Sequence, residues 1–206
     1  MSDRSLRPVS ALTGVAVPGR YGKNHGTPGV TIAERQGLGI ATVAARKGQA
    51  TALKTAVSEA YGVALPDGSR AAQGPQGSFV GYGPDQWLAV SESLANEALA
   101  RDLAEKLMGF ASISDQHGGR TVLRLSGPRA RDVLAKGLPI DLHPRAFAPG
   151  NAATSTISLM GVQLWQVDDA PTYDIALFRS VSESFWHWLT ASAAEFGYDV
   201  NRPQGA

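Results

Sequence analysis

The chain has 206 residues and falls into two halves, each with several strand-like runs and two helical segments. Runs such as residues 38–44 (LGIATVA) and 120–125 (RTVLRL) carry the β-branched residues that are typical of strands. These runs do not alternate one by one with helices, as they would in a doubly wound parallel sheet. We therefore predict an α+β fold with mainly antiparallel sheets and flanking helices.

The first half contains two amphipathic segments. Residues 50–62 place Leu53 and Val57 on one helical stripe, and Gly62 stands where a left-handed residue would end the helix. In residues 94–107, apolar side chains recur at intervals of four. Both segments are predicted to be helices that bury one face.

The second half also contains two predicted helices. One opens after Pro128, where a missing N–H costs nothing. The other begins at Ser180, with Glu183 at the spacing of a capping box. Trp186 lies off the apolar stripe of this last helix, so we expect it to be exposed in a lone monomer and to indicate a partner surface.

Composition suggests four segments along the chain. Residues 1–27 are rich in Gly, Pro and Arg and show no period, so we predict an irregular N-terminal arm. The two α+β subdomains are expected at 28–109 and 110–200, with a frayed tail at 201–206.

The charge balance excludes some classes of partner. The formal net charge is +1, without runs of like charge, which argues against nucleic acid or an anionic membrane. Cysteine is absent, which suits a reducing compartment, and no segment resembles a signal peptide or a membrane span. We expect a cytoplasmic protein.

The stretch SISDQHGG (112–119) raises the question of a catalytic cluster. Ser112, Ser114, Asp115 and His117 are the residue types of a serine, histidine and aspartate triad. Closeness in sequence does not place such groups within hydrogen-bonding distance, and neither serine lies in a G-x-S-x-G elbow. We favour a polar strand end followed by a turn at the two glycines.

A second polar pair, Asp141 and His143, lies in LPIDLHP and is interpreted as a turn in preference to a catalytic base. The histidines are scattered, so a metal site is not expected. We predict no catalytic, cofactor-binding or metal-binding residue on this chain. Asp115, His117, Asp141, His143 and Trp186 remain candidates for an interface or a vestigial site.

Four motif blocks follow one another along most of the chain. They are G-P-D-Q-W-L (83–88), S-D-Q-H (114–117) with S-G-P-R-A (126–130), L-P-I-D-L-H-P (138–144) and W-H-W-L (186–189). Four such blocks in this order are fairly specific, and their succession resembles the gamma subunit of heterotetrameric sarcosine oxidase.

The step from S-G-P-R-A into a helix, followed by Asp141, also resembles the first domain of the glycine-cleavage T-protein, a folate-dependent aminomethyltransferase. That resemblance implies two intertwined α+β subdomains. In those enzymes a carboxylate near the place of Asp141 acts on the substrate amine. This chain is far shorter, and we expect neither their C-terminal barrel nor a retained folate or amine site.

The sarcosine oxidase resemblance implies a role in an oxidoreductase complex. Such a complex oxidatively demethylates sarcosine to glycine with tetrahydrofolate and oxygen, giving methylene-tetrahydrofolate and hydrogen peroxide. The resemblance implies FAD, FMN, NAD and zinc on other subunits, and alpha, beta and delta subunits as partners. The gamma chain is then a non-catalytic assembly subunit without a cofactor of its own.

Two alternatives remain open from the sequence. The chain could be the equivalent subunit of an N-methylglutamate dehydrogenase, which has similar subunits. It could also be a stand-alone folate-binding, aminomethyltransferase-like protein that uses Asp141 as its carboxylate.

Overall fold

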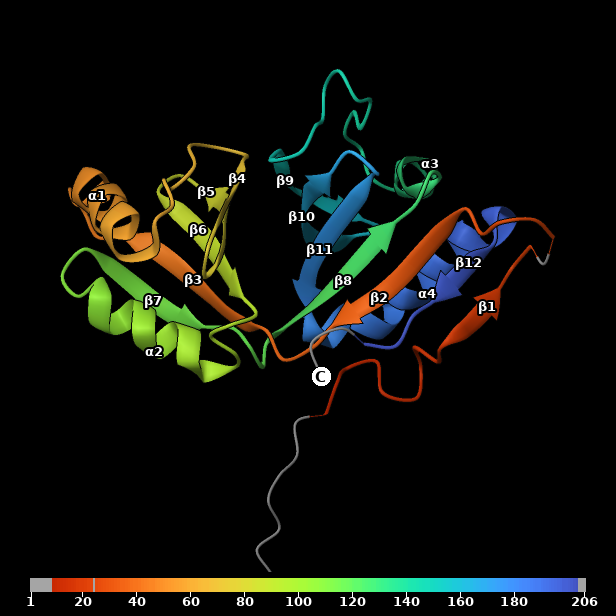
Figure 1. Ribbon diagram of the computed structural model, residues 1–206, viewed down its shortest axis with the longest axis horizontal. Helices are drawn as coiled ribbons and strands as arrows, with labels where there is room; N and C mark the ends of the chain where they lie inside the picture. The colour runs from red at the N-terminus through yellow and green to blue at the C-terminus, as the bar shows by residue number, and fades with distance from the viewer. Residues whose placement is uncertain (1–8, 24, 204–206) are drawn as a thin grey trace, which may run out of the picture.

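The computed structural model describes residues 9–23 and 25–203, which form two β-sheets (Figure 1). In spatial order the seven-stranded sheet contains β1 (Gly19–Tyr21), β12 (Tyr198–Val200), β2 (Val30–Arg35), β8 (Arg120–Ser126), β11 (Thr172–Phe178), β10 (Met160–Asp168) and β9 (Ala152–Ile157). The five-stranded sheet contains β4 (Ala71–Gly74), β5 (Gly77–Gly83), β6 (Gln86–Ser91), β3 (Gly39–Ala45) and β7 (Ala111–Asp115). All neighbouring strands are antiparallel except β12 and β2.

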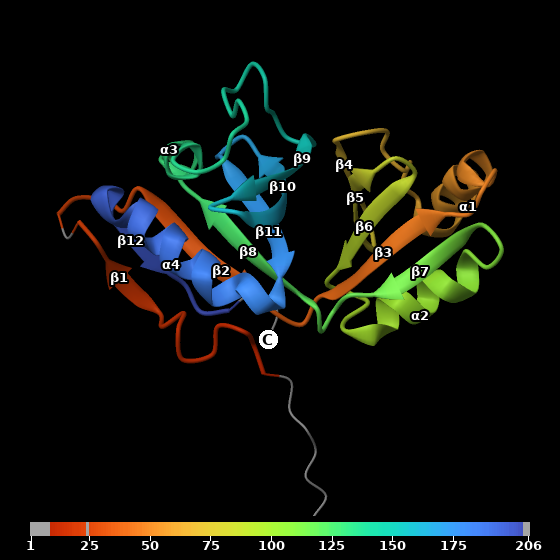
Figure 2. The same cartoon turned by 180° about the vertical axis from the view of Figure 1, so that it is seen from behind.

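The helices cover the outer faces of both sheets (Figure 2). Helices α1 (Ala50–Tyr61) and α2 (Glu97–Lys106) pack on the five-stranded sheet. Helices α3 (Ala130–Ala135) and α4 (Ser182–Ala193) pack on the seven-stranded sheet. Two 3-10 turns flank α4, η1 at Arg179–Val181 and η2 at Ala194–Phe196.

A third apolar cluster lies between the inner faces of the two sheets. Successive side chains of a strand point to opposite faces of its sheet. A strand that packs against helices on one face and against the other sheet on the second face is therefore apolar throughout. Strand β6 is an example, since five of its six residues are buried. The fully or nearly fully buried members of the cluster are Leu38, Ile40, Val80, Leu88, Val90, Val122, Ala152, Trp165 and Ala176.

The chain crosses twice between the sheets. Strand β2 belongs to the seven-stranded sheet and β3 to the other, while β7 and β8 are divided in the reverse order. Figure 1 shows both connections, residues 36–38 and 116–119, running between the sheets near one another. The strands of each sheet therefore do not come from one predicted subdomain alone. The predicted subdomain limits, 28–109 and 110–200, stay a prediction.

The helical periodicity in the first half is confirmed. Leu53 and Val57 of α1 are completely buried, and Gly62 ends the helix with φ 63°. In α2, the buried residues are Leu99 and Leu103. These features depend on nearest neighbours along the helix, which sequence patterns capture well.

The predicted capping box of α4 is wrong. The 3-10 turn η1 precedes the helix, which begins at Ser182 without a side-chain cap. The hydroxyl of Ser182 instead donates to Thr121 Oγ1 at 2.8 Å. Glu183 lies 3.8 Å from the ring of His187, one turn further along the helix. The buried bond to β8 fixes the start of the helix in place of the local cap.

The predicted N-terminal arm contains more structure than its composition suggests. Strand β1 pairs with β12 at the edge of the seven-stranded sheet. Leu12 is 1% exposed and joins the core between that sheet and α4. Residues 1–8 and 24 of the arm and 204–206 of the tail lie outside the described residues.

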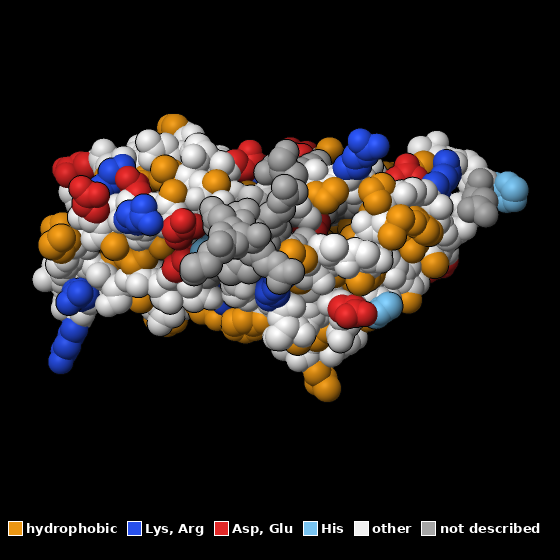
Figure 3. Space-filling model, turned by 90° about the horizontal axis from the view of Figure 1, so that it is seen from below, with side chains coloured by type: hydrophobic (Ala, Val, Ile, Leu, Met, Phe, Trp, Pro, Cys, Tyr) orange, Lys and Arg blue, Asp and Glu red, His pale blue; other side chains and the backbone are white. Residues whose placement is uncertain are grey.

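The surface in Figure 3 carries hydrophobic side chains interspersed with acidic and basic ones. Among the helices of the described residues, none combines the length and the apolar character that crossing a membrane requires.

Candidate functional site

Asp115 and His117 lie at the connection from β7 to β8. The Asp115 carboxylate accepts a hydrogen bond from the backbone N–H of His117 at 3.0 Å and lies 2.8 Å from the ring Nδ1 of His117. The chain turns over His117–Gly119, so the predicted polar turn is confirmed. Within the described residues, Ser112 and Ser114 make no hydrogen bond with the His117 ring, and this group therefore lacks the nucleophile contact of a triad.

The electrostatics of this pair follow from the turn. Burial alone would raise the pKa of Asp115, but the hydrogen bonds from the backbone and ring of His117 outweigh it and lower the pKa below its usual 3.8. Both side chains are about one-third exposed, so water screens the pair. The interaction holds the turn and adds little to overall stability.

We expect Asp115→Asn to destabilise the chain by less than about 1 kcal/mol near neutral pH, the range for exposed ion pairs. Because the folded-state pKa of Asp115 is lowered, its stabilising contribution is complete above pH of about 4 and is lost as the pH falls through the folded-state pKa. Thermal unfolding of wild type and variant across this range should show the difference shrinking in acid. A difference that stays constant down to the lowest pH would contradict this account.

Asp141 and His143 lie in the loop between α3 and β9. The Asp141 carboxylate accepts the backbone N–H of His143 at 2.8 Å, and His143 Nδ1 accepts the backbone N–H of Arg145 at 3.2 Å. Both side chains are exposed. Each therefore stabilises a local turn, as the sequence pattern predicts.

The predicted exposure of Trp186 is wrong. Its side chain is buried, at 6% exposure, and it belongs to the core cluster that joins α4 to the seven-stranded sheet. Leu12 of the N-terminal segment belongs to the same cluster. We attribute the burial of Trp186 to this N-terminal segment. With the segment in the same cluster, α4 has neighbours in addition to the sheet and buries a wider face than its single apolar stripe.

The structure does not bring these candidates together. Figure 1 shows the β7–β8 connection at the bottom of the view and the loop after α3 at the top. Across the described residues, no group of three His, Asp or Glu side chains is arranged to hold a metal ion.

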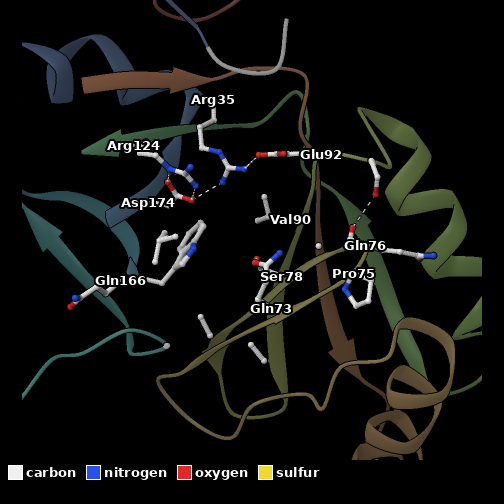
Figure 4. Close-up of a pocket in the computed structure, with 17 residues that line it drawn as sticks. Arg35, Gln73, Pro75, Gln76, Ser78, Val90, Glu92, Arg124, Gln166 and Asp174 are labelled. Atoms are coloured by element: carbon white, nitrogen blue, oxygen red, sulfur yellow. Dashed lines mark hydrogen bonds and ion pairs between the residues drawn. The ribbon is translucent and has the colours of Figure 1, made fainter. Parts of the chain in front are cut away.

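A cavity lined by four charged side chains lies between the sheets and has a volume of about 440 Å³. Figure 4 shows Arg35, Arg124 and Asp174 on one wall, facing Ser78 and Val90 on the other. The indole of Trp165 and several amide side chains complete the lining. The residues that line it are Arg35, Ala71, Ala72, Gln73, Pro75, Gln76, Gly77, Ser78, Val90, Glu92, Ser93, Arg124, Gly150, Trp165, Gln166, Val167 and Asp174.

A buried ion cluster forms one wall of this cavity. Asp174, 1% exposed, accepts hydrogen bonds from Arg35 Nη1 at 2.6 Å and from Arg124 Nε and Nη2 at 2.7 and 2.8 Å. The hydrogen bonds with Asp174 raise the pKa of Arg124 despite burial. Arg35 also pairs with Glu92, which follows β6 and thereby links the two sheets.

The chemistry of this cluster is structural. Both oxygens of Asp174 already accept hydrogen bonds from guanidinium groups, which suits a permanent cross-link among β2, β8 and β11 more than proton transfer. The residues of this cluster were not among the predicted candidates. One signal was available, since Asp174 interrupts the apolar strand YDIALF, where an unpaired carboxylate would be costly.

The matching family model and the curated relatives point to one family. The model of the sarcosine oxidase gamma subunit family matches residues 46–195. The sarcosine oxidase subunit gamma of Corynebacterium sp. (strain P-1) is 38% identical over 144 residues, covering 68% of this chain and 70% of that protein. The subunit gamma of Corynebacterium sp. (strain U-96) is 33% identical over 163 residues, covering 77% and 75%.

Solved structures agree with the sequence relatives. The chain matches 96% of a chain of heterotetrameric sarcosine oxidase from Corynebacterium sp. U-96, over 92% of its own length, with a TM-score of 0.78 and 28% identity. It also matches 49% of an aminomethyltransferase T of the glycine cleavage system from Bartonella henselae, with a TM-score of 0.59 and 13% identity. The second match concerns the fold alone and confirms the predicted α+β architecture. The chain belongs to the sarcosine oxidase gamma subunit family.

Proposed function

We propose that this chain works as the gamma subunit of a heterotetrameric sarcosine oxidase and is a non-catalytic assembly subunit of that enzyme. The observation that carries the proposal is the match to a chain of the solved heterotetramer over 92% of this chain and 96% of the other. A match over nearly the full length of both chains supports the same role in the same kind of complex.

The non-catalytic role is supported by what the polar candidates already do. The Asp115 and Asp141 carboxylates accept backbone N–H groups within their own turns, and the rings of His117 and His143 contact the same turns. Asp174 is fully engaged by two arginines. We propose that Asp115, His117, Asp141 and His143 maintain the shape of the subunit.

The rest of the reaction is assigned to other chains. We propose that alpha, beta and delta subunits carry the FAD, FMN, NAD and zinc, with tetrahydrofolate as the co-substrate of the assembled enzyme in the cytoplasm. Family membership supports this division. The alternatives, a stand-alone folate-binding protein or a subunit of N-methylglutamate dehydrogenase, find no support in the comparisons.

This role predicts normal turnover from complexes that carry His117→Ala or Asp141→Asn. The complex is purified with each variant, its subunit content is checked by size-exclusion chromatography, and sarcosine-dependent peroxide formation is measured per intact complex. We expect rates within about twofold of wild type, because each side chain is proposed to stabilise only its own turn. A fall of about 100-fold with the complex intact would indicate an acid or base in the reaction and contradict the proposal.

A further inference from the structure

Arg120, the first residue of β8, lies in an unusual environment. Arg120 as a whole is 7% exposed. Its guanidinium carbon lies 4.5 Å from the ring centre of Phe178 and 5.4 Å from the ring centre of Tyr82. Phe178 is directly opposite Arg120 in the β8–β11 ladder, while Tyr82 comes from β5 of the other sheet. The two rings hold the guanidinium at the boundary between the sheets.

This guanidinium lacks a counter-charge among the residues that the structure describes. No carboxylate oxygen in this part of the chain lies within 4.0 Å of it. Its hydrogen bond to the Tyr82 hydroxyl is long, at 3.4 Å, and its buried Nε makes none. Arg124, four residues along the same strand, has Asp174 as its partner. A buried arginine is normally paired with an anion, whereas the contacts of Arg120 within the described residues are two aromatic rings and one long hydrogen bond.

Arg120 itself is buried, but it lies beside apolar residues that are partly exposed. Phe178 is 49% exposed. Val162 pairs with Leu177, so the residues one step further along each strand, Gly161 and Phe178, come close to one another. A Cβ at Gly161 would meet nothing within 4 Å, so this part of the sheet is open. Exposed aromatic residues beside an arginine are typical of the energetically important part of a protein interface.

The adjacent hairpin tip adds an exposed apolar anchor. Leu159, between β9 and β10, is 98% exposed, and Ser158 and Leu159 have φ of 46° and 67°. Two-residue turns of this kind favour Asn-Gly, because left-handed φ values are costly for a leucine. A strained turn that presents a leucine to water suggests a role in contact with another molecule.

We propose that these residues form a docking surface, the Arg120 surface, composed of Tyr82, Arg120, Leu159, Gly161 and Phe178. It binds an acidic and apolar segment of another subunit of the sarcosine oxidase complex, and a carboxylate of that segment pairs with Arg120. The inference rests on the proposed function. A small anion would satisfy the guanidinium but leave Leu159 and Phe178 in water, so the chemistry of the surface fits a protein segment best.

A competition experiment tests the surface in the full complex. Wild-type and variant chains with different tags are co-expressed with the other subunits, and their ratio in the purified complex is measured by mass spectrometry. We expect Arg120→Met, Leu159→Ser and Gly161→Trp to be incorporated about 30-fold less than wild type, the loss typical of an interface hot spot. The control is Met108→Ser, a 74% exposed residue after α2, which should be incorporated equally.

Folding and function are separated within the same experiment. Leu159 and Gly161 are exposed, so their variants should unfold at the wild-type temperature, and removing an unpaired buried charge at Arg120 should not lower that temperature. If all three variants enter the complex as well as wild type, the docking surface is wrong and the proposed function stands. If wild type itself recovers no other subunit, the proposed function fails. An isolated wild-type dimer that Gly161→Trp dissociates would identify a second copy as the occupant and overturn the inference.

Discussion

Replacing Asp174 with alanine is expected to lower the free energy of unfolding by about 3–5 kcal/mol, the cost of breaking a buried ion pair by removing one partner. The variant leaves the guanidinium groups of Arg35 and Arg124 without their shared acceptor beside the inter-sheet cavity. Urea unfolding measures the effect, with an unchanged slope showing that the folded state remains compact. The link between the two sheets through Arg35 and Glu92 should weaken at the same time.

The matched control for this prediction is Asp67→Ala. Asp67 also pairs with a cation, Lys54, but its side chain is 88% exposed. Its loss should change the free energy of unfolding by less than about 1 kcal/mol. Similar effects of Asp174→Ala and Asp67→Ala would contradict the view that the buried cluster holds the strands together.

Gly81→Ala is expected to destabilise the chain by about 3 kcal/mol or more, at the upper end of what overpacking costs. A Cβ at Gly81 would lie 1.8 Å from the backbone oxygen of Gly68, and a backbone atom cannot rotate away as a side chain can. Gly81 also donates its N–H to the oxygen of Arg70 at 2.8 Å, which fixes the separation of the two segments. The loss should appear in urea unfolding of the isolated chain.

Gly83→Ala is the control for this prediction, two residues further along β5. Its Cβ would meet nothing within 4 Å, and its φ lies outside the left-handed region. We expect a change within about 0.5 kcal/mol. If Gly83→Ala destabilised the chain as much as Gly81→Ala, general strand propensity and not the close approach of Gly68 would be responsible.

Features that depend on neighbours in sequence could be predicted. Leu53 and Val57 follow the period of α1, and Gly62 ends it, because a helix repeats the same geometry every turn. The turns at Asp115–His117 and Asp141–His143 were also predictable, since Asp side chains commonly accept backbone N–H groups two residues ahead.

Features that depend on tertiary neighbours could not be predicted. Trp186 belongs to a buried cluster that also includes Leu12 of the N-terminal segment, and no helical period can indicate such a distant neighbour. Arg35 and Asp174 are separated by 139 residues and meet only because β2 joins the sheet of β8 and β11. Strand β2 likewise lies in the sheet formed mostly by the second half of the chain, and β7 lies in the other sheet. Which strands pair depends on contacts that the sequence of a single strand does not determine.

Gentle purification of the tagged chain from its native host tests most directly whether this chain is an assembly subunit of a sarcosine-oxidising complex. The native mass, the co-purifying chains and the visible spectrum are recorded in one experiment. We predict a complex with one copy of this chain, larger partners that carry flavin absorbance, and sarcosine-dependent peroxide formation. A colourless chain that elutes alone under the same conditions would contradict the account.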